Sequence, residues 1–140
     1  RAHVEQWAMK LGLSHQVRFL GFIPREQVLK LYAESTAMVY PSTFGPENLP
    51  PLEAFAIGCP VAAARIPGAA EQLGDAALLF DPHDHEAMAD AIYAVIHDTE
   101  LRRKLVERGR ARATRWSTEH FADGLLAWFD RFAVVRELWP

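Results

Sequence analysis

The stretch STFGPENLPPLEAFAIGCPVAAA, residues 42–64, carries the most information about the fold. It follows the apolar run AMVYP (37–41), which predicts a strand that ends at Pro41. Its middle, PLEAFAIG, has the spacing of a short helix, and its end, PVAAA (60–64), predicts a second strand. The loop before the helix is rich in glycine, which widens the range of allowed backbone angles, and in proline, which fixes φ. The stretch therefore predicts a strand, a constrained loop, a helix and a strand in that order.

Outward from this unit, short apolar runs continue to alternate with helical patterns. Further strands are expected at VRFLGF (17–22) and AALLF (76–80), and RIPGAAEQLGD (65–75) is expected to be a loop. Helices are expected over 3–11, from Pro24 through Tyr32, and near 84–97, 99–114 and 117–135. Strands that alternate with helices indicate a parallel sheet covered on both faces. The predicted fold class is α/β, a Rossmann-like three-layer α/β/α arrangement.

Composition sets wider limits. The 140 residues fit one domain, half of them are hydrophobic, and the net charge of −3 gives no overall attraction to nucleic acid or anionic membrane. The single cysteine, Cys59, cannot form an internal disulfide, which suits a reducing compartment. No apolar run approaches the roughly 20 residues that a membrane span needs. Because Arg1 already lies inside a helix-like pattern, we expect the sequence to be a piece of a longer chain.

The loop of residues 42–53 has the features of a ligand site. In parallel sheets, ligands bind outside the carboxyl ends of the strands, where such loops enter helices. Gly45 permits close approach of a ligand, and Pro50 and Pro51 fix the start of a helix that we expect near Pro51. The free amides of its first turn suit a phosphate, and Glu53 in that turn suits the diol of a ribose. The alternative is a stiffened turn whose glutamate satisfies the helix end; spacing alone leaves both interpretations open.

A family resemblance bears on this choice. FGPENLPPLEAFAIGCPV, followed by PGAAEQLGDAALLFDPHDHEAMADAI, resembles the C-terminal, donor-binding domain of retaining GT-B glycosyltransferases, family four or glycosyl transferases group 1. The resemblance covers nearly the whole chain. It implies an enzyme that transfers a sugar, with retention, from a nucleotide-diphosphate sugar to a glycan or lipid-linked acceptor. It further implies bacterial polysaccharide or cell-surface glycan synthesis, a cytoplasmic location with peripheral contact to the inner face of the membrane, and no metal or other cofactor. The GPENLPPLEAFA version of the loop favours GDP-mannose as the donor.

The resemblance also assigns roles to residues of the loop. Glu53 matches the second glutamate of the family's E-x7-E pair, which holds the ribose. Gly45 stands where the first glutamate belongs, so Glu47 or Asn48 is expected to take over its catalytic contact with the donor sugar. The amide of Leu49, with that of Asn48, matches those that face the diphosphate.

Three further residues match positions near the donor. Phe22 and Ile23 match the loop that borders the base, and Glu71 matches the glutamate of the family's G-x-x-E motif, at the donor-side loop. For Glu71 a plain helix-start role is equally open.

The resemblance implies that the domain is partial. Two strands, a basic Arg and Lys pair and the whole acceptor domain are expected upstream of Arg1, and the isolated piece is expected to be inactive. The helix of 117–135 would pack back on the absent N-terminal domain. Its apolar stripe, if uncovered, predicts self-association; its members are Phe121, Leu125, Trp128, Phe129 and Phe132.

Other features have simpler explanations. His83 and His85 suggest a metal site with Asp81, but Asp84 is better explained as a helix N-cap. The basic residues within 102–115 suggest nucleic-acid binding, but helical spacing and the lack of interleaved aromatic residues favour a solvated helix face. Packing is the expected role of Cys59.

Two other functions stay open. A non-catalytic nucleotide-binding module is favoured slightly by Gly45 in place of a glutamate and disfavoured by the extended motif match. A sugar-nucleotide epimerase shares the architecture, but its catalytic acids would have to come from sequence upstream of Arg1.

Overall fold

The computed structural model describes residues 1–45, 49–115 and 118–137, with side chains described as far as residue 132. Its centre is a parallel sheet in the order β1 (Met38–Tyr40), β2 (Val61–Ala64) and β3 (Ala77–Phe80). The register pairs Met38 with Val61 and Val61 with Ala77. The helices are α1 (Ala2–Lys10), α2 (Arg25–Glu34), α3 (Leu49–Ile57), α4 (Ala69–Leu73), α5 (His85–His97), α6 (Thr99–Ala113) and α7 (Thr118–Glu137), with a 3₁₀ turn η1 (Gly74–Ala76).

Strand β2 explains the layered arrangement, because all four of its residues are buried. Its small side chains alternate between the two faces of the sheet. Val61 and Ala63 belong to the core cluster beneath α2, α3 and α6, whereas Ala62 and Ala64 belong to the cluster beneath α5. The sheet is thus buried on both faces, as predicted for a three-layer α/β/α fold.

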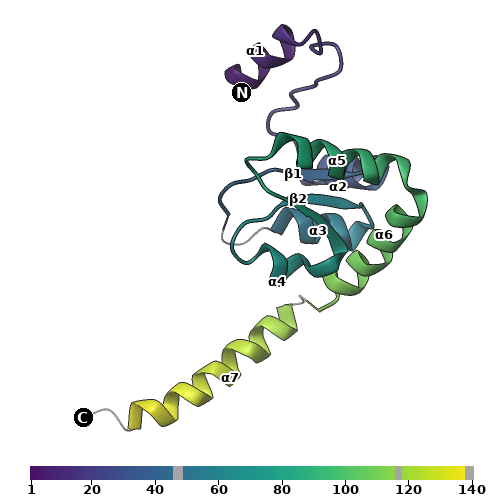
Figure 1. The fold of residues 1–140 in the computed structure, drawn as a ribbon. Helices are drawn as coiled ribbons and strands as arrows, with labels where there is room; N and C mark the ends of the chain where they lie inside the picture. The colour runs from purple at the N-terminus through teal and green to yellow at the C-terminus, as the bar shows by residue number, and fades with distance from the viewer. Residues whose placement is uncertain (46–48, 116–117, 138–140) are drawn as a thin grey trace.

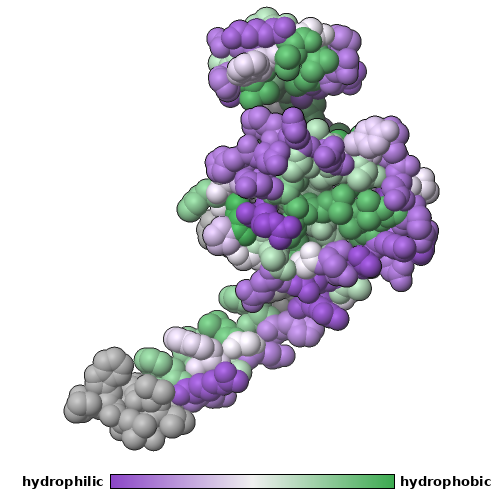
Figure 2. Space-filling view, viewed as in Figure 1, coloured by the Kyte–Doolittle hydropathy of each residue, from purple (hydrophilic) through white to green (hydrophobic). Residues whose placement is uncertain are grey.

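Helices α1 and α7 extend away from this three-layer body (Figure 1). Residues 11–24 connect α1 to α2, and α7 follows α6 after a short connection. Large apolar side chains stay exposed on both helices, including Trp7 on α1 and Trp128 on α7. Figure 2 shows apolar surface on α1, on the body and along α7. Within the described residues, no helix combines the length and the hydrophobicity needed to cross a membrane.

Three expectations about the elements are wrong. Residues 17–22 form no strand, because a strand needs a hydrogen-bonded neighbour and the described part of the chain provides none beside them. The stretch 65–75, expected as a loop, contains α4 and the start of η1. Glu53, expected in the first turn of its helix, lies beyond that turn, because α3 already begins at Leu49, two residues before Pro51. The other expected strands and helices are confirmed to within about two residues, the usual uncertainty of element ends.

Candidate functional site

A pocket of about 170 Å³ lies at the carboxyl end of the sheet. Its walls come from two loops: Thr43, Phe44 and Gly45 follow β1, and Ile66 and Pro67 follow β2. Because β1 and β2 are parallel neighbours, the loops at their carboxyl ends meet at the same edge. The pocket therefore lies where an open α/β sheet is expected to bind a ligand.

Local hydrogen bonds hold both walls of the pocket. In the first loop, the Ser42 hydroxyl donates to the Phe44 carbonyl at 2.5 Å. In the second, the Arg65 backbone N–H donates to the Phe80 carbonyl at 2.7 Å, which ties this loop to the end of β3. The Phe44 ring is 86% exposed. A bound molecule could therefore cover an apolar ring that the protein itself leaves uncovered.

Gly45 is the one residue of the predicted site, among those described, that lines this pocket. Thr43, Phe44, Ile66 and Pro67 were not predicted as site residues. The glycine and proline content marks both loops as special in sequence, but their approach depends on strand pairing across some twenty residues. Glu47 and Asn48, expected as the catalytic pair, lie outside the described residues.

Glu53 lies on α3 and is half-buried. Burial, and secondly the nearby Glu53 carboxylate, raise the pKa of Tyr32 on α2 above its ordinary value. Glu53 is not among the side chains that line the pocket.

The first turn of α3 offers few amide donors. Leu49 is its first residue, and the prolines at 50 and 51 carry no N–H group. Helix N-termini normally leave several N–H groups free for anions. Among the first three residues of this helix, only Leu49 therefore carries an N–H group, which is one of the two amides expected to face the diphosphate.

Phe22 and Ile23, in the connection before α2, are not among the residues that line the pocket. Phe22 is fully exposed and follows Gly21, whose φ of 66° is in the left-handed region, while Ile23 is half-buried. Glu71 lies in the first turn of α4 with an exposed side chain. Because α4 directly follows the second loop, Glu71 belongs to the same segment as Ile66 and Pro67.

The residues that suggested a metal have local roles. Asp84 caps α5 by accepting from the Ala87 N–H at 2.9 Å, which confirms the predicted N-cap, and Asp81 accepts from the His83 N–H at 2.8 Å. Among the described residues, no three His, Cys, Asp or Glu side chains are grouped so that they could hold a metal ion. Cys59 is buried as predicted, and burial raises the pKa of its thiol.

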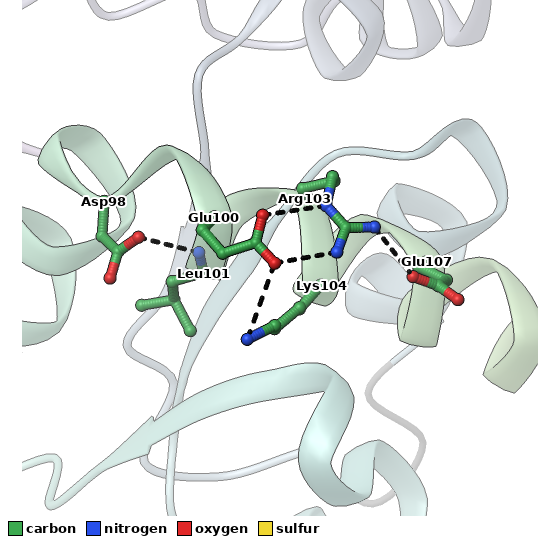
Figure 3. A network of polar contacts seen from close by, with 6 residues as sticks. All are labelled: Asp98, Glu100, Leu101, Arg103, Lys104 and Glu107. Carbon is green, nitrogen blue, oxygen red and sulfur yellow. Dashed lines mark hydrogen bonds and ion pairs between the residues drawn. The ribbon is translucent and has the colours of Figure 1, made fainter.

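Five basic residues of α6 have two kinds of partner. Arg103 and Lys104 form exposed ion pairs with Glu100, and Arg103 also reaches Glu107 (Figure 3), as a solvated helix face would. Arg102, Arg108 and Arg112 instead donate to backbone carbonyls of other elements. The helical pattern alone gave no signal for this second group, because their acceptors are set by tertiary packing.

Comparisons with known proteins agree on one family. The family model described as "Glycosyl transferases group 1" matches residues 1–112. O-antigen chain mannosyltransferase B of Escherichia coli is 36% identical over 104 residues, which are 74% of this chain and 27% of that protein. A D-inositol 3-phosphate glycosyltransferase of Corynebacterium urealyticum is 34% identical over 139 residues, 98% of this chain and 33% of that protein.

A solved structure also matches this chain. Sucrose-phosphate synthase from Thermosynechococcus elongatus matches with a TM-score of 0.80 and 29% identity, over 95% of this chain and 34% of that one. The chain thus spans about a quarter to a third of the length of the proteins it matches.

Proposed function

The chain belongs to the glycosyl transferases group 1 family and has the predicted GT-B fold, and from this premise we propose that it is the donor-binding half of a retaining glycosyltransferase. The whole protein transfers a sugar from a nucleotide-diphosphate sugar to a glycan or lipid-linked acceptor. It acts in the cytoplasm, with peripheral contact to the inner face of the membrane.

The pocket at the carboxyl end of β1 and β2 is the observation that supports this proposal best. One of its walls belongs to the FGPENLPPLE segment that carries the family resemblance, and the other ends at Pro67, four residues before Glu71. The placement fits a ligand held between two loops of one sheet edge. Apolar walls at Phe44, Ile66 and Pro67 suit the carbon-rich face of a sugar or base and help to exclude water.

In the proposed mechanism, positioning and electrostatics carry the reaction. Glu53 holds the ribose, the amides of Asn48 and Leu49 face the diphosphate, and Glu47 or Asn48 orients the donor sugar. The positive end of the α3 dipole offsets part of the charge on the leaving diphosphate. Basic residues outside this chain neutralise the rest, so the scheme uses no metal.

We assign GDP-mannose as the donor. The loop sequence favours it, and one of the matched proteins is named as a mannosyltransferase. Other matched proteins bear the name D-inositol 3-phosphate glycosyltransferase, so both the base and the sugar of the donor need an experimental test. The match to a glycosyltransferase family over most of the chain favours neither the non-catalytic module nor the epimerase.

Product analysis on the full-length protein tests the proposal. The protein is incubated with GDP-mannose, or with UDP-glucose as comparison, and a lipid-linked glycan acceptor, and the new linkage is assigned by NMR. We expect a product with the anomeric configuration of the donor. Hydrolysis to free sugar only, or a product of inverted configuration, would contradict it. Glu47→Gln and Asn48→Ala should identify which residue orients the sugar, while Glu86→Gln, on the α5 side of the sheet, should leave transfer unchanged.

A further inference from the structure

Two arginines of α6 hold the short segment that follows the second pocket loop. Arg112 donates through Nε to the Gln72 carbonyl at 2.9 Å and through Nη2 to the Glu71 carbonyl. Arg108 donates through Nη1 to the Asp75 carbonyl at 3.2 Å, and its Nε lies 3.4 Å from the Asp75 carboxylate. All of these acceptors lie in α4 or η1, about 33 to 41 residues earlier in the chain.

Helix α4 needs such support because it is only five residues long. A helix of this length is not stable by itself, and its last carbonyls lack partners within the helix. Glycines in the left-handed region flank it, Gly68 with φ 82° and Gly74 with φ 56°. The Arg112 guanidinium lies against Gly74, where a Cβ would be 3.4 Å from Arg112 Cζ. Burial of Ala69 and Leu73 fixes one side of α4, and the arginines fix its carbonyl end.

Two other arginines on the same helix have different partners. Arg103 pairs with Glu100 and Glu107 on its own helix, and Arg102 donates to the carbonyls of Val95 and Ile96 at the end of α5. Arg108 and Arg112 thus both donate hydrogen bonds from α6 to α4 or η1, and Arg112 is the one that contacts the backbone of Glu71.

We propose that Arg112, supported by Arg108, is a positioning residue for donor binding. It acts by fixing α4, which sets where Pro67 forms the pocket wall and where the Glu71 carboxylate is presented. This inference rests on the proposed function, and it adds to the donor site a side chain that does not touch the donor. Arg112 acts through Glu71 and the loop of residues 65–68.

Steady-state kinetics of the full-length enzyme with GDP-mannose as the probe donor test this role, with UDP-glucose assayed beside it. We expect Arg112→Gln to raise the KM for the donor about tenfold with kcat changed less than about twofold, the size expected from losing charge-assisted hydrogen bonds. Arg112→Lys keeps the charge and should recover part of the loss. Arg103→Gln is the matched control and should behave as wild type.

A double-mutant cycle separates positioning from general stability. In a Glu71→Gln background, Arg112→Gln should raise KM by less than about twofold further, because both changes act on one unit. Hydrogen exchange should become faster in residues 69–75 of Arg112→Gln and stay unchanged in β2 and α5.

Each other result has a definite meaning. A wild-type KM in Arg112→Gln, full additivity with Glu71→Gln, or faster exchange throughout the sheet would overturn the positioning role while the proposed function stands. A folded wild type that neither binds nor transfers either donor would overturn the proposed function, and this inference with it.

Discussion

Gly109 is a glycine in the middle of α6 because Phe55 of α3 occupies the space that a side chain would need. A Cβ at this position would lie 2.8 Å from Phe55 Cδ1, and the Phe55 ring is fully buried. The ring has no open space into which it can retreat. A close approach of two helices thus explains a residue that is otherwise unfavourable within a helix.

Gly109→Ala should therefore destabilise the protein. Overpacking of a core typically costs about 1–3 kcal/mol, which exceeds the roughly 0.5–1 kcal/mol that alanine gains over glycine in a helix. Gly124→Ala is the matched control, because a Cβ there meets nothing within 4 Å, and it should leave stability unchanged or slightly raised. The free energy of unfolding of both variants is measured with urea. A Gly109→Ala variant as stable as the wild type, or more stable, would contradict the packing account.

Sequence predicted the residues whose roles are local and missed those whose roles are tertiary. The Asp84 cap and the buried Cys59 follow from their immediate neighbours in the chain. Gly109 and Arg112 depend on partners about 40 to 54 residues away. The sequence pattern of α6 does not indicate which residues these partners are.

At the scale of elements, α6 combines a capped start with a charged outer face. Asp98 accepts from the Leu101 N–H at 2.8 Å, and Glu100 then pairs with Arg103 and Lys104 (Figure 3). The hydrogen bond from Arg103 is the main cause that lowers the pKa of Glu100 to about 2. Acidic groups in the first turn and basic groups further along also suit the helix dipole.

The lowered pKa of Glu100 gives α6 a defined response to acid. Because the folded pKa lies below the ordinary value of 4.5, the contribution of Glu100 to stability is present above pH 4.5 and is lost as the pH falls toward about 2. NMR titration of the Glu100 carboxyl should show this low pKa, and Arg103→Gln should move it back toward 4.5. An unchanged pKa in Arg103→Gln would contradict the pairing.

Most elements could be predicted because their signals are regular. Helices α5 and α6 show apolar periodicity after an N-cap residue, and β2 and β3 are short apolar runs between breakers. Residues 17–22 have the same strand-like composition, but composition does not supply a neighbouring strand. Helix α4 was missed because two glycines and a proline within a few residues resemble a loop.

At the scale of the whole molecule, α1 and α7 lie outside the three-layer body (Figure 1). Described aromatic side chains of α7 contact one another: the Trp128 and Phe132 ring centroids are 5.4 Å apart and stacked, and both rings are exposed. An apolar stripe of this kind is typical of a surface that another surface covers. The packing of this helix on an N-terminal domain remains a prediction.

The 140-residue chain alone should therefore self-associate. Replacing Phe121, Trp128, Phe129 and Phe132 together by serine removes the exposed rings of this stripe and changes no residue of the three-layer body. Sedimentation of the unaltered chain should show oligomers that the variant with four substitutions lacks. A monomeric unaltered chain would contradict this expectation.

The site could be predicted in part. In a parallel sheet the ligand is expected at the carboxyl ends of the strands, and the motif resemblance indicates the loop after β1. Which side chains of two separate loops meet, such as Phe44 and Pro67, follows only from the folded backbone. The turn of α3 that carries Glu53 also depends on where that helix begins.

Nucleotide binding by the full-length protein tests the central claim most directly. Calorimetry with GDP and UDP is compared for wild type, for Glu53→Ala, and for Glu86→Ala, a control in the first turn of α5. We predict binding of GDP in preference to UDP, weakened by about 1.5–3 kcal/mol in Glu53→Ala through lost hydrogen bonds to a charged group, and unchanged in Glu86→Ala. Absence of binding to either nucleotide by the folded wild type would contradict the account.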